Sequence, residues 1–224
     1  MDRRSWDQTS SLPVAFVMPE FRALLINCSL KPEGEPSSTQ AMLDKVAGVL
    51  KANDVKCEFV RAVDAGIKFG VDTNMGKGDG WPKIHKKILA ADMLVIGTPI
   101  WLGQRCAVCQ MVLERMDAML NETNGQGQMP LYGKVAGICV VGNEDGAQHV
   151  GASVLYNLMQ IGATIPPNAE AYWIGPAGGQ DDFVDVALDD EYVKSLVDYL
   201  GNNLVHVARS LRATPIPPIG NVKA

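Results

Sequence analysis

The sequence predicts an α/β fold in which a doubly wound, five-stranded parallel sheet carries helices on both faces. Short apolar runs of strand length recur along the chain, and segments with helical apolar spacing separate them. The 224 residues fit one large domain that can bury a sizeable core. Alternating strands and helices of this kind indicate parallel strands joined by crossover helices.

The individual elements follow from these patterns. The predicted strands are residues 23–27, 56–62, 93–98, 135–141 and 169–174. Residues 38–53 form a predicted helix with an apolar face of Met42, Val46, Val49 and Leu50. Further helices are predicted over 81–92, with Pro82 in the first turn, and over 106–120, 151–162 and 189–213. Residues 65–82 and 121–134 are irregular and predict loops.

Charge and composition argue against nucleic-acid binding, secretion and membrane insertion. The net charge is −5 and the basic residues form no stripe, so we expect no nucleic-acid partner. The N-terminus lacks a secretory pattern, and no apolar segment approaches the roughly 20 residues needed to cross a bilayer. The five cysteines are an odd number, and Cys28 and Cys139 lie in apolar runs, which favours core thiols in a reducing compartment. We therefore expect a soluble cytoplasmic protein without membrane contact.

The ends of the chain differ from its centre. Residues 1–20 predict an N-terminal arm, 21–212 the folded domain, and 213–224 a C-terminal tail. Prolines in both ends prevent long regular elements. The apolar segment 14–18 is a candidate subunit contact, and disordered ends are the alternative.

Three loops are candidates for ligand binding, because ligands of such sheets lie beyond the carboxyl ends of the strands. After the first strand, Ser29 is followed by Ser37, Ser38 and Thr39 at a helix start. Amides and hydroxyls at a helix start form a cradle for phosphate, although serine is also a common N-cap without a ligand. Neither G-x-G-x-x-G nor G-x-x-x-x-G-K-[ST] is present.

The loops after the third and fourth predicted strands complete the candidate site. Residues 98–103 hold Trp101, against which a planar ring can rest. Residues 142–149 form a polar turn whose backbone can approach a ligand at Gly142 and Gly146. Each loop has an alternative as a plain strand-to-helix turn. Together they predict a phosphate at the first loop and a flat ring between the other two.

Three stretches, "INCSLKPEGEPSST", "ADMLVIGTPIWLGQ" and "YGKVAGICVVGNEDGAQHV", resemble the flavodoxin-like, NAD(P)H-dependent FMN reductase family, over residues 21–212. The resemblance implies a flavodoxin-like sheet of order 2-1-3-4-5, FMN as cofactor, NADPH or NADH as co-substrate, and a homodimer or homotetramer. Carried over by position, the phosphate residues are Ser29, Ser37, Ser38 and Thr39; the ring and ribityl residues are Thr98, Pro99, Ile100, Trp101, Leu102 and Gly103; and those at the ring's far edge are Gly142, Asn143, Glu144, Asp145 and Gly146. The first loop is longer than usual in this family, and its Glu33 and Glu35 disfavour a phosphate unless they point to solvent.

Two functions are compatible with a bound flavin. One is an enzyme that takes hydride from NAD(P)H and passes it to a flavin, quinone or similar small electron acceptor. The alternative is a flavodoxin-type electron-transfer protein that does not oxidise NAD(P)H. The loop "GNEDGAQH" has no aromatic side chain to cover the ring, and the net charge is modest. Both observations favour the reductase.

Histidine and cysteine offer further candidates. His149, near the predicted site, is a candidate proton donor to a quinone product, with a solvent-facing histidine as the alternative. His85, in the run "IHKK", is predicted on a solvated helix face. No histidine pair has metal-ligand spacing. Cys106 and Cys109 form C-x-x-C at a helix start, and a structural role is favoured over a redox dithiol.

Overall fold

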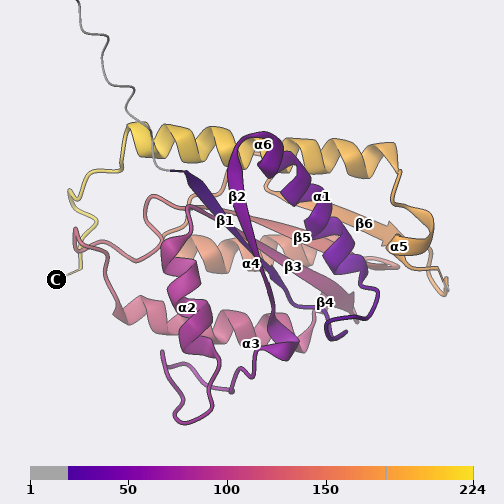
Figure 1. The fold of residues 1–224 in the computed structure, drawn as a ribbon, viewed down its shortest axis with the longest axis horizontal. Coiled ribbons are helices and arrows are strands. Elements are labelled where there is room, and N and C mark those ends of the chain that lie inside the picture. The colour runs from indigo at the N-terminus through magenta and orange to yellow at the C-terminus, as the bar shows by residue number, and fades with distance from the viewer. Residues whose placement is uncertain (1–19, 180, 224) are drawn as a thin grey trace, which may run out of the picture.

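The computed structural model describes residues 20–179 and 181–223, which form a parallel sheet between two helical layers (Figure 1). The parallel strands are β1 (Phe21–Asn27), β2 (Val55–Arg61), β3 (Met93–Trp101), β5 (Val135–Asn143) and β6 (Glu170–Gly175). Their order is β2-β1-β3-β5-β6, and the two-residue β4 (Gln104–Arg105) pairs antiparallel with the end of β3. When β4 is left out of the numbering, this is the predicted order 2-1-3-4-5.

The helices match the predicted ones with three differences, of which one is that the helix predicted over 106–120 ends at Met116 and continues as a 3-10 turn. They are α1 (Ser38–Ala52), α2 (Trp81–Ala90), α3 (Ala107–Met116), α4 (Ala147–Gln160), α5 (Phe183–Val186) and α6 (Glu191–Ala213), with 3-10 turns η1 (Ala62–Asp64) and η2 (Asp117–Asn121). Helix α4 begins four residues before its predicted start at residue 151. Helix α5 was not predicted.

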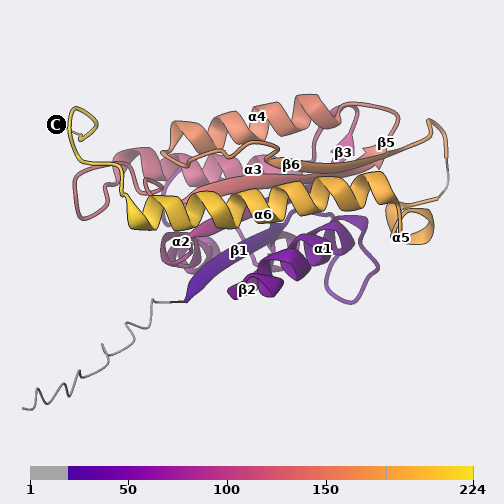
Figure 2. The ribbon, with the colours of Figure 1, turned by 90° about the horizontal axis from the view of Figure 1, so that it is seen from above.

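The core consists of two clusters, one on each face of the sheet. Successive strand side chains point to opposite faces, so Leu24 and Ile26 pack with α2, α3 and α4, whereas Ala23 and Leu25 pack with α1 and α6. In Figure 1, α6 runs above the sheet and α3 below it, and the view from above in Figure 2 separates α4 from α1. Burial of both faces explains why the strands are continuously apolar.

A buried ion pair anchors the irregular segment between β2 and α2. Arg115 of α3 donates hydrogen bonds to both carboxylate oxygens of Asp79, at 3.1 and 2.8 Å, and both side chains are fully buried. Its guanidinium also donates to the carbonyl oxygens of Lys68 and Asp72. These hydrogen bonds hold the pKa of Asp79 well below its usual range. The glycine-rich run 76–80 is therefore tied to α3.

The prediction for His85 was wrong. Its side chain is buried on α2, and Nε2 lies 2.9 Å from a carboxylate oxygen of Glu122. Thr73 donates to the other oxygen of that carboxylate. Because Glu122 is 37 residues away, local spacing on the helix gives no sign of this partner.

The C-terminal tail lies against the loop before β5. The buried Gln128 side chain donates to the carbonyl oxygens of Ile216 and Pro217, and the Lys223 amide donates to the Gly127 carbonyl. The predicted arm, including the proposed subunit contact at 14–18, lies outside the described residues except for Glu20. Within 20–179 and 181–223, no helix has both the length and the apolar character needed to cross a membrane.

Candidate functional site

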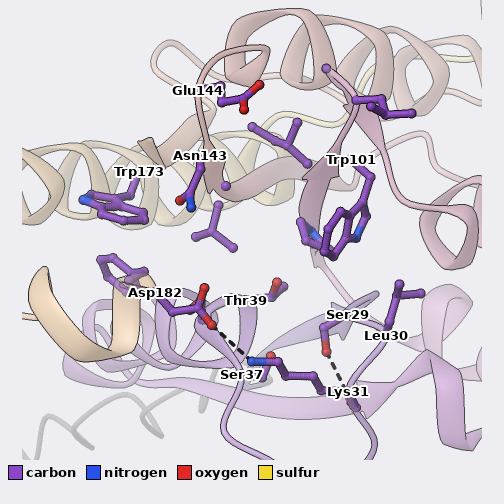
Figure 3. Close-up of a pocket in the computed structure, with 18 of the residues that line it drawn as sticks. Ser29, Leu30, Lys31, Ser37, Thr39, Trp101, Asn143, Glu144, Trp173 and Asp182 are labelled. Atoms are coloured by element: carbon purple, nitrogen blue, oxygen red, sulfur yellow. Dashed lines mark hydrogen bonds and ion pairs between the residues drawn. The ribbon is translucent and has the colours of Figure 1, made fainter. Parts of the chain in front are cut away.

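A cavity of about 370 Å³ lies at the carboxyl ends of β1, β3 and β5, where the sequence places the ligand. This volume falls in the range typical of cofactor and small-molecule sites. Figure 3 shows side chains from the three predicted loops facing it. The lining residues from these loops are Ser29, Leu30, Lys31, Ser37, Ser38, Thr39, Pro99, Ile100, Trp101, Leu102, Gly103, Gly142, Asn143, Glu144 and Asp145.

The first loop ends at the N-terminus of α1. Ser37 has extended backbone angles, and its hydroxyl accepts the Gln40 amide at 3.2 Å, so it is the N-cap of the helix. The amides of the first helical turn have no partners within the helix, and they carry the positive end of its dipole. The exposed Glu33 and Glu35 lie outside the cavity lining, so their carboxylates are not placed against an anion at this helix end.

Arg61, the last residue of β2, holds the first loop in place. Its guanidinium donates to the carbonyl oxygens of Lys31 and Pro32 at 2.8 and 3.0 Å, and to the Gln40 side chain at 3.4 Å. At the start of the loop, the Ser29 amide donates to the Asn27 side chain at 2.8 Å. These hydrogen bonds hold the loop from Leu30 to Pro36, whose seven residues have no regular secondary structure.

The second and third loops touch each other at Gly103 and Gly146. The β3–β4 hairpin turns at Leu102 and Gly103, both with positive φ, 51° and 70°. Gly146 has φ 94°, and a Cβ there would lie 2.9 Å from the Gly103 Cα. Only glycine combines this backbone conformation with such close approach. The hairpin leaves Trp101 58% exposed at the edge of the cavity.

Three predicted residues lie outside the lining. Thr98 is fully buried, and its hydroxyl accepts the Cys106 amide at 3.3 Å. Gly146 supports the Gly103 backbone from behind. His149 is exposed on α4, where Nε2 lies 3.1 Å from the side-chain oxygen of Gln104. The proposed roles of the lining residues, and of His149, stay predictions.

A group of buried thiols lies next to the cavity loops. Cys106 caps α3 by accepting the Cys109 amide at 3.4 Å, and its thiol donates to the Cys28 carbonyl oxygen at 2.8 Å. Burial raises the pKa of Cys106, and a hydrogen bond to Cys109 together with burial raises that of Cys28 well above its usual value. Cys106 and Cys109 are both buried, and inaccessible thiols are poor nucleophiles, which favours a structural role over a redox dithiol.

A fourth wall of the cavity was missed by sequence reasoning. It consists of Val141, Trp173, Asp182 and Phe183, of which the last two belong to the α5 region. The rings of Trp173 and Phe183 pack with centroids 5.8 Å apart at 53°. Lys31, also missed, forms an ion pair with Asp182 at 3.2 Å. The spacing of Asp182 and Asp185, a capping box, is the signal that predicts a helix start here.

The comparisons with known proteins agree with this geometry. A profile of the family described as NADPH-dependent FMN reductase matches residues 21–175. The chain belongs to the NADPH-dependent FMN reductase family. The family's description names FMN and NADPH, in agreement with the predicted FMN cofactor and the predicted co-substrate, NADPH or NADH. The match ends at the last residue of β6, so α5, Asp182 and Phe183 lie beyond it.

Two curated proteins are similar to this family member over most of its length. The 8-demethyl-8-aminoriboflavin-5'-phosphate synthase of Streptomyces davaonensis is 38% identical over 87% of the chain and 79% of that protein. The divalent metal cation transporter MntH of Mycobacterium bovis is 36% identical over 92% of the chain. The chain spans only 31% of the length of the latter.

Solved structures support the same fold. RosB, crystallised with the intermediate 8-demethyl-8-formylriboflavin-5'-phosphate, has a TM-score of 0.81 and 36% identity, over 88% of this chain and 82% of RosB. An archaeal flavodoxin is 9% identical with a TM-score of 0.54, over 84% of this chain and 99% of the flavodoxin. The fold is therefore flavodoxin-like.

Proposed function

We propose that this protein is an FMN-dependent oxidoreductase that takes hydride from NAD(P)H and passes it to a flavin, quinone or similar small acceptor. The observation that carries this proposal is one cavity that joins the N-terminus of α1, suited to a phosphate, to an apolar slot suited to a flat ring. Family membership supports FMN as the molecule with both features. FMN, when bound, supplies a ring that accepts hydride.

The residues of the cavity fit the two parts of FMN. The first-turn amides of α1, the hydroxyls of Ser29 and Ser38, and the Lys31 ammonium are suited to the phosphate. The touching loops at Gly103 and Gly146 suit one side of the ring, and Trp173 offers an aromatic surface. We further propose that Trp101 and Leu102, 58% and 102% exposed, contact the second substrate or a second subunit.

The test is an anaerobic absorbance record of the FMN-loaded protein on addition of NADPH, then NADH, then a quinone. Rapid bleaching of the flavin by a nucleotide, reversed by the quinone over many turnovers, is expected. Tight FMN binding without bleaching, together with a stable one-electron-reduced form after dithionite, would favour the electron-transfer protein instead. Absence of FMN binding would contradict the cofactor assignment.

A second function rests on the relatives at 36–38% identity. One is named for the synthesis of a modified flavin phosphate, and RosB was crystallised with a flavin phosphate modified at the same position. We propose as the alternative that FMN is the substrate that is altered here. Mass spectrometry of the flavin recovered after aerobic incubation of the FMN-loaded protein with an amino-group donor separates the two: unaltered FMN supports the reductase, and a changed flavin mass supports the alternative.

The phosphate assignment has its own test at Ser38. A carboxylate introduced by Ser38→Glu would occupy the end of α1 that favours negative charge, and would repel the phosphate. We expect FMN affinity to fall at least tenfold, while riboflavin affinity changes little. Ser38→Ala is the matched control and should lose much less affinity. An unchanged FMN affinity in Ser38→Glu would place the phosphate elsewhere.

A further inference from the structure

An ion pair lies at one side of the cavity. Lys31 Nζ from the first loop lies 3.2 Å from Asp182 Oδ2 at the start of α5, and Figure 3 shows this pair at the cavity. The two side chains are 45% and 50% exposed. Lys31 is the one lysine or arginine among the described residues that line the cavity. An anion bound in the cavity can therefore pair with this ammonium.

The main chain of Lys31 is held by two hydrogen bonds, whereas its ammonium is held by a half-exposed ion pair. Arg61 donates to the Lys31 carbonyl oxygen at 2.8 Å, and the Ser29 hydroxyl donates to the same oxygen at 3.3 Å. The four-carbon side chain ends in a point charge with three donors that can rotate freely. Lys31 can therefore exchange one acceptor for another without movement of the loop that forms the phosphate cradle.

Asp182 is held where it can compete for that ammonium. It is the N-cap residue of α5, in a capping box with Asp185. The next residue, Phe183, is fully buried and packs against Trp173. The main chain of Asp182 is thus held at the cavity wall, where Glu144 and Asp145 add two further negative charges.

We propose that Asp182 sets the affinity of this site for phosphorylated flavins by competing with the flavin phosphate for Lys31. This inference rests on the proposed binding of FMN. The carboxylate weakens the hold on a phosphate dianion and leaves the ring contacts unaffected. The site is thereby adjusted to exchange FMN with free flavin rather than to retain it permanently. Since Asp182 lies beyond residue 175, where the family match ends, the competing charge comes from the part of the chain outside the family profile.

The test compares FMN with riboflavin, which lacks the phosphate, in fluorescence titrations of wild type, Asp182→Asn and the matched control Asp181→Asn. Asparagine is as good an N-cap as aspartate, so α5 should persist. Asp182→Asn should bind FMN about threefold to fivefold more tightly, in line with a partly exposed charge pair. Its riboflavin affinity should not change, and Asp181→Asn should match wild type for both ligands. Asp182→Ser, which also provides an N-cap, should reproduce the gain.

A double-mutant cycle tests whether Asp182 acts through Lys31. Lys31→Met should weaken FMN binding but not riboflavin binding, and in this background the gain from Asp182→Asn should shrink. An equal gain with and without Lys31 would overturn the competition, because Asp182 would then act directly on the phosphate. Weaker or unchanged FMN binding by both Asp182 variants, or an equal gain for riboflavin, would also overturn it. If wild type bound no FMN, the proposed function would fail as well, which separates the two failures.

Discussion

Glu170 on the edge strand β6 should make the stability of this protein fall as the pH rises from about 4.5 to 7. Its carboxyl faces α4, where a Cβ on Gly151 would overlap it, and the buried Oε1 has no hydrogen-bond partner. Burial raises the pKa of this carboxyl from its ordinary value of 4.5 to about 7. The folded state therefore holds a proton that the unfolded state has released over this range.

The sign and size of the effect follow from proton linkage. Between pH 4.5 and 7 the folded protein binds more protons than the unfolded chain, so the free energy of unfolding decreases as the pH rises. Each pKa unit corresponds to about 1.4 kcal/mol. The full difference would be about 3.4 kcal/mol, and because the carboxyl is only partly buried we expect about 2 kcal/mol.

The perturbation is Glu170→Gln, which keeps the shape of the side chain and removes its titration. Urea unfolding at pH 5 and pH 8 gives the free energies for wild type, the variant and the exposed control Glu35→Gln. Glu170→Gln should gain about 2 kcal/mol over wild type between pH 5 and pH 8, whereas the control should follow wild type. Parallel pH profiles for wild type and Glu170→Gln would refute the reasoning.

Three further predictions concern the buried ion pair, the thiols and the touching loops. Asp79→Asn leaves the Arg115 charge buried without a carboxylate and should cost about 3–5 kcal/mol in urea unfolding; a loss below about 1 kcal/mol would contradict this. The stability that Asp79 provides in wild type should disappear as the pH falls below the ordinary carboxyl range, because its pKa is lowered. With a thiol reagent at pH 8, only the half-buried Cys57 of the five free cysteines should react before unfolding, and rapid reaction of three thiols would refute the buried placement. Gly146→Ala should weaken flavin binding, because the added methyl group would overlap the Gly103 backbone. Gly34→Ala is the control, because Gly34 has a similar positive φ and open space around it. Equal flavin affinities in the two variants would show that the loop contact is irrelevant.

The strands, their order and the three cavity loops could be predicted from the sequence, because burial on both faces leaves continuous apolar runs with turn residues after them. The hairpin at β4 could not, since its turn uses Leu102 at positive φ rather than the usual Asn-Gly pair. The four-residue α5 is too short for helical periodicity.

The sequence patterns did not identify residues whose hydrogen-bond or ion-pair partners are far away along the chain. Lys31 stands in a loop predicted for phosphate, yet its partner Asp182 is 151 residues away. His85 follows a surface-like pattern but is buried on α2 and lies against Glu122, which follows η2. The serine at the helix start was left open between cap and ligand. Ser37 serves as the cap, which leaves Ser38 as the hydroxyl to test.

The contact between Gly103 and Gly146 has a consequence for engineering the site. The contact packs the backbone of the loop after β3 against the backbone of the loop after β5. A side chain introduced at that wall therefore disturbs main-chain packing. The opposite wall is built differently, because residues 176–179 and 181–187 carry mostly exposed side chains around the buried Phe183 and Ala187. A combinatorial library aimed at new flavin analogues should therefore randomise exposed positions of that segment and leave the glycine contact intact.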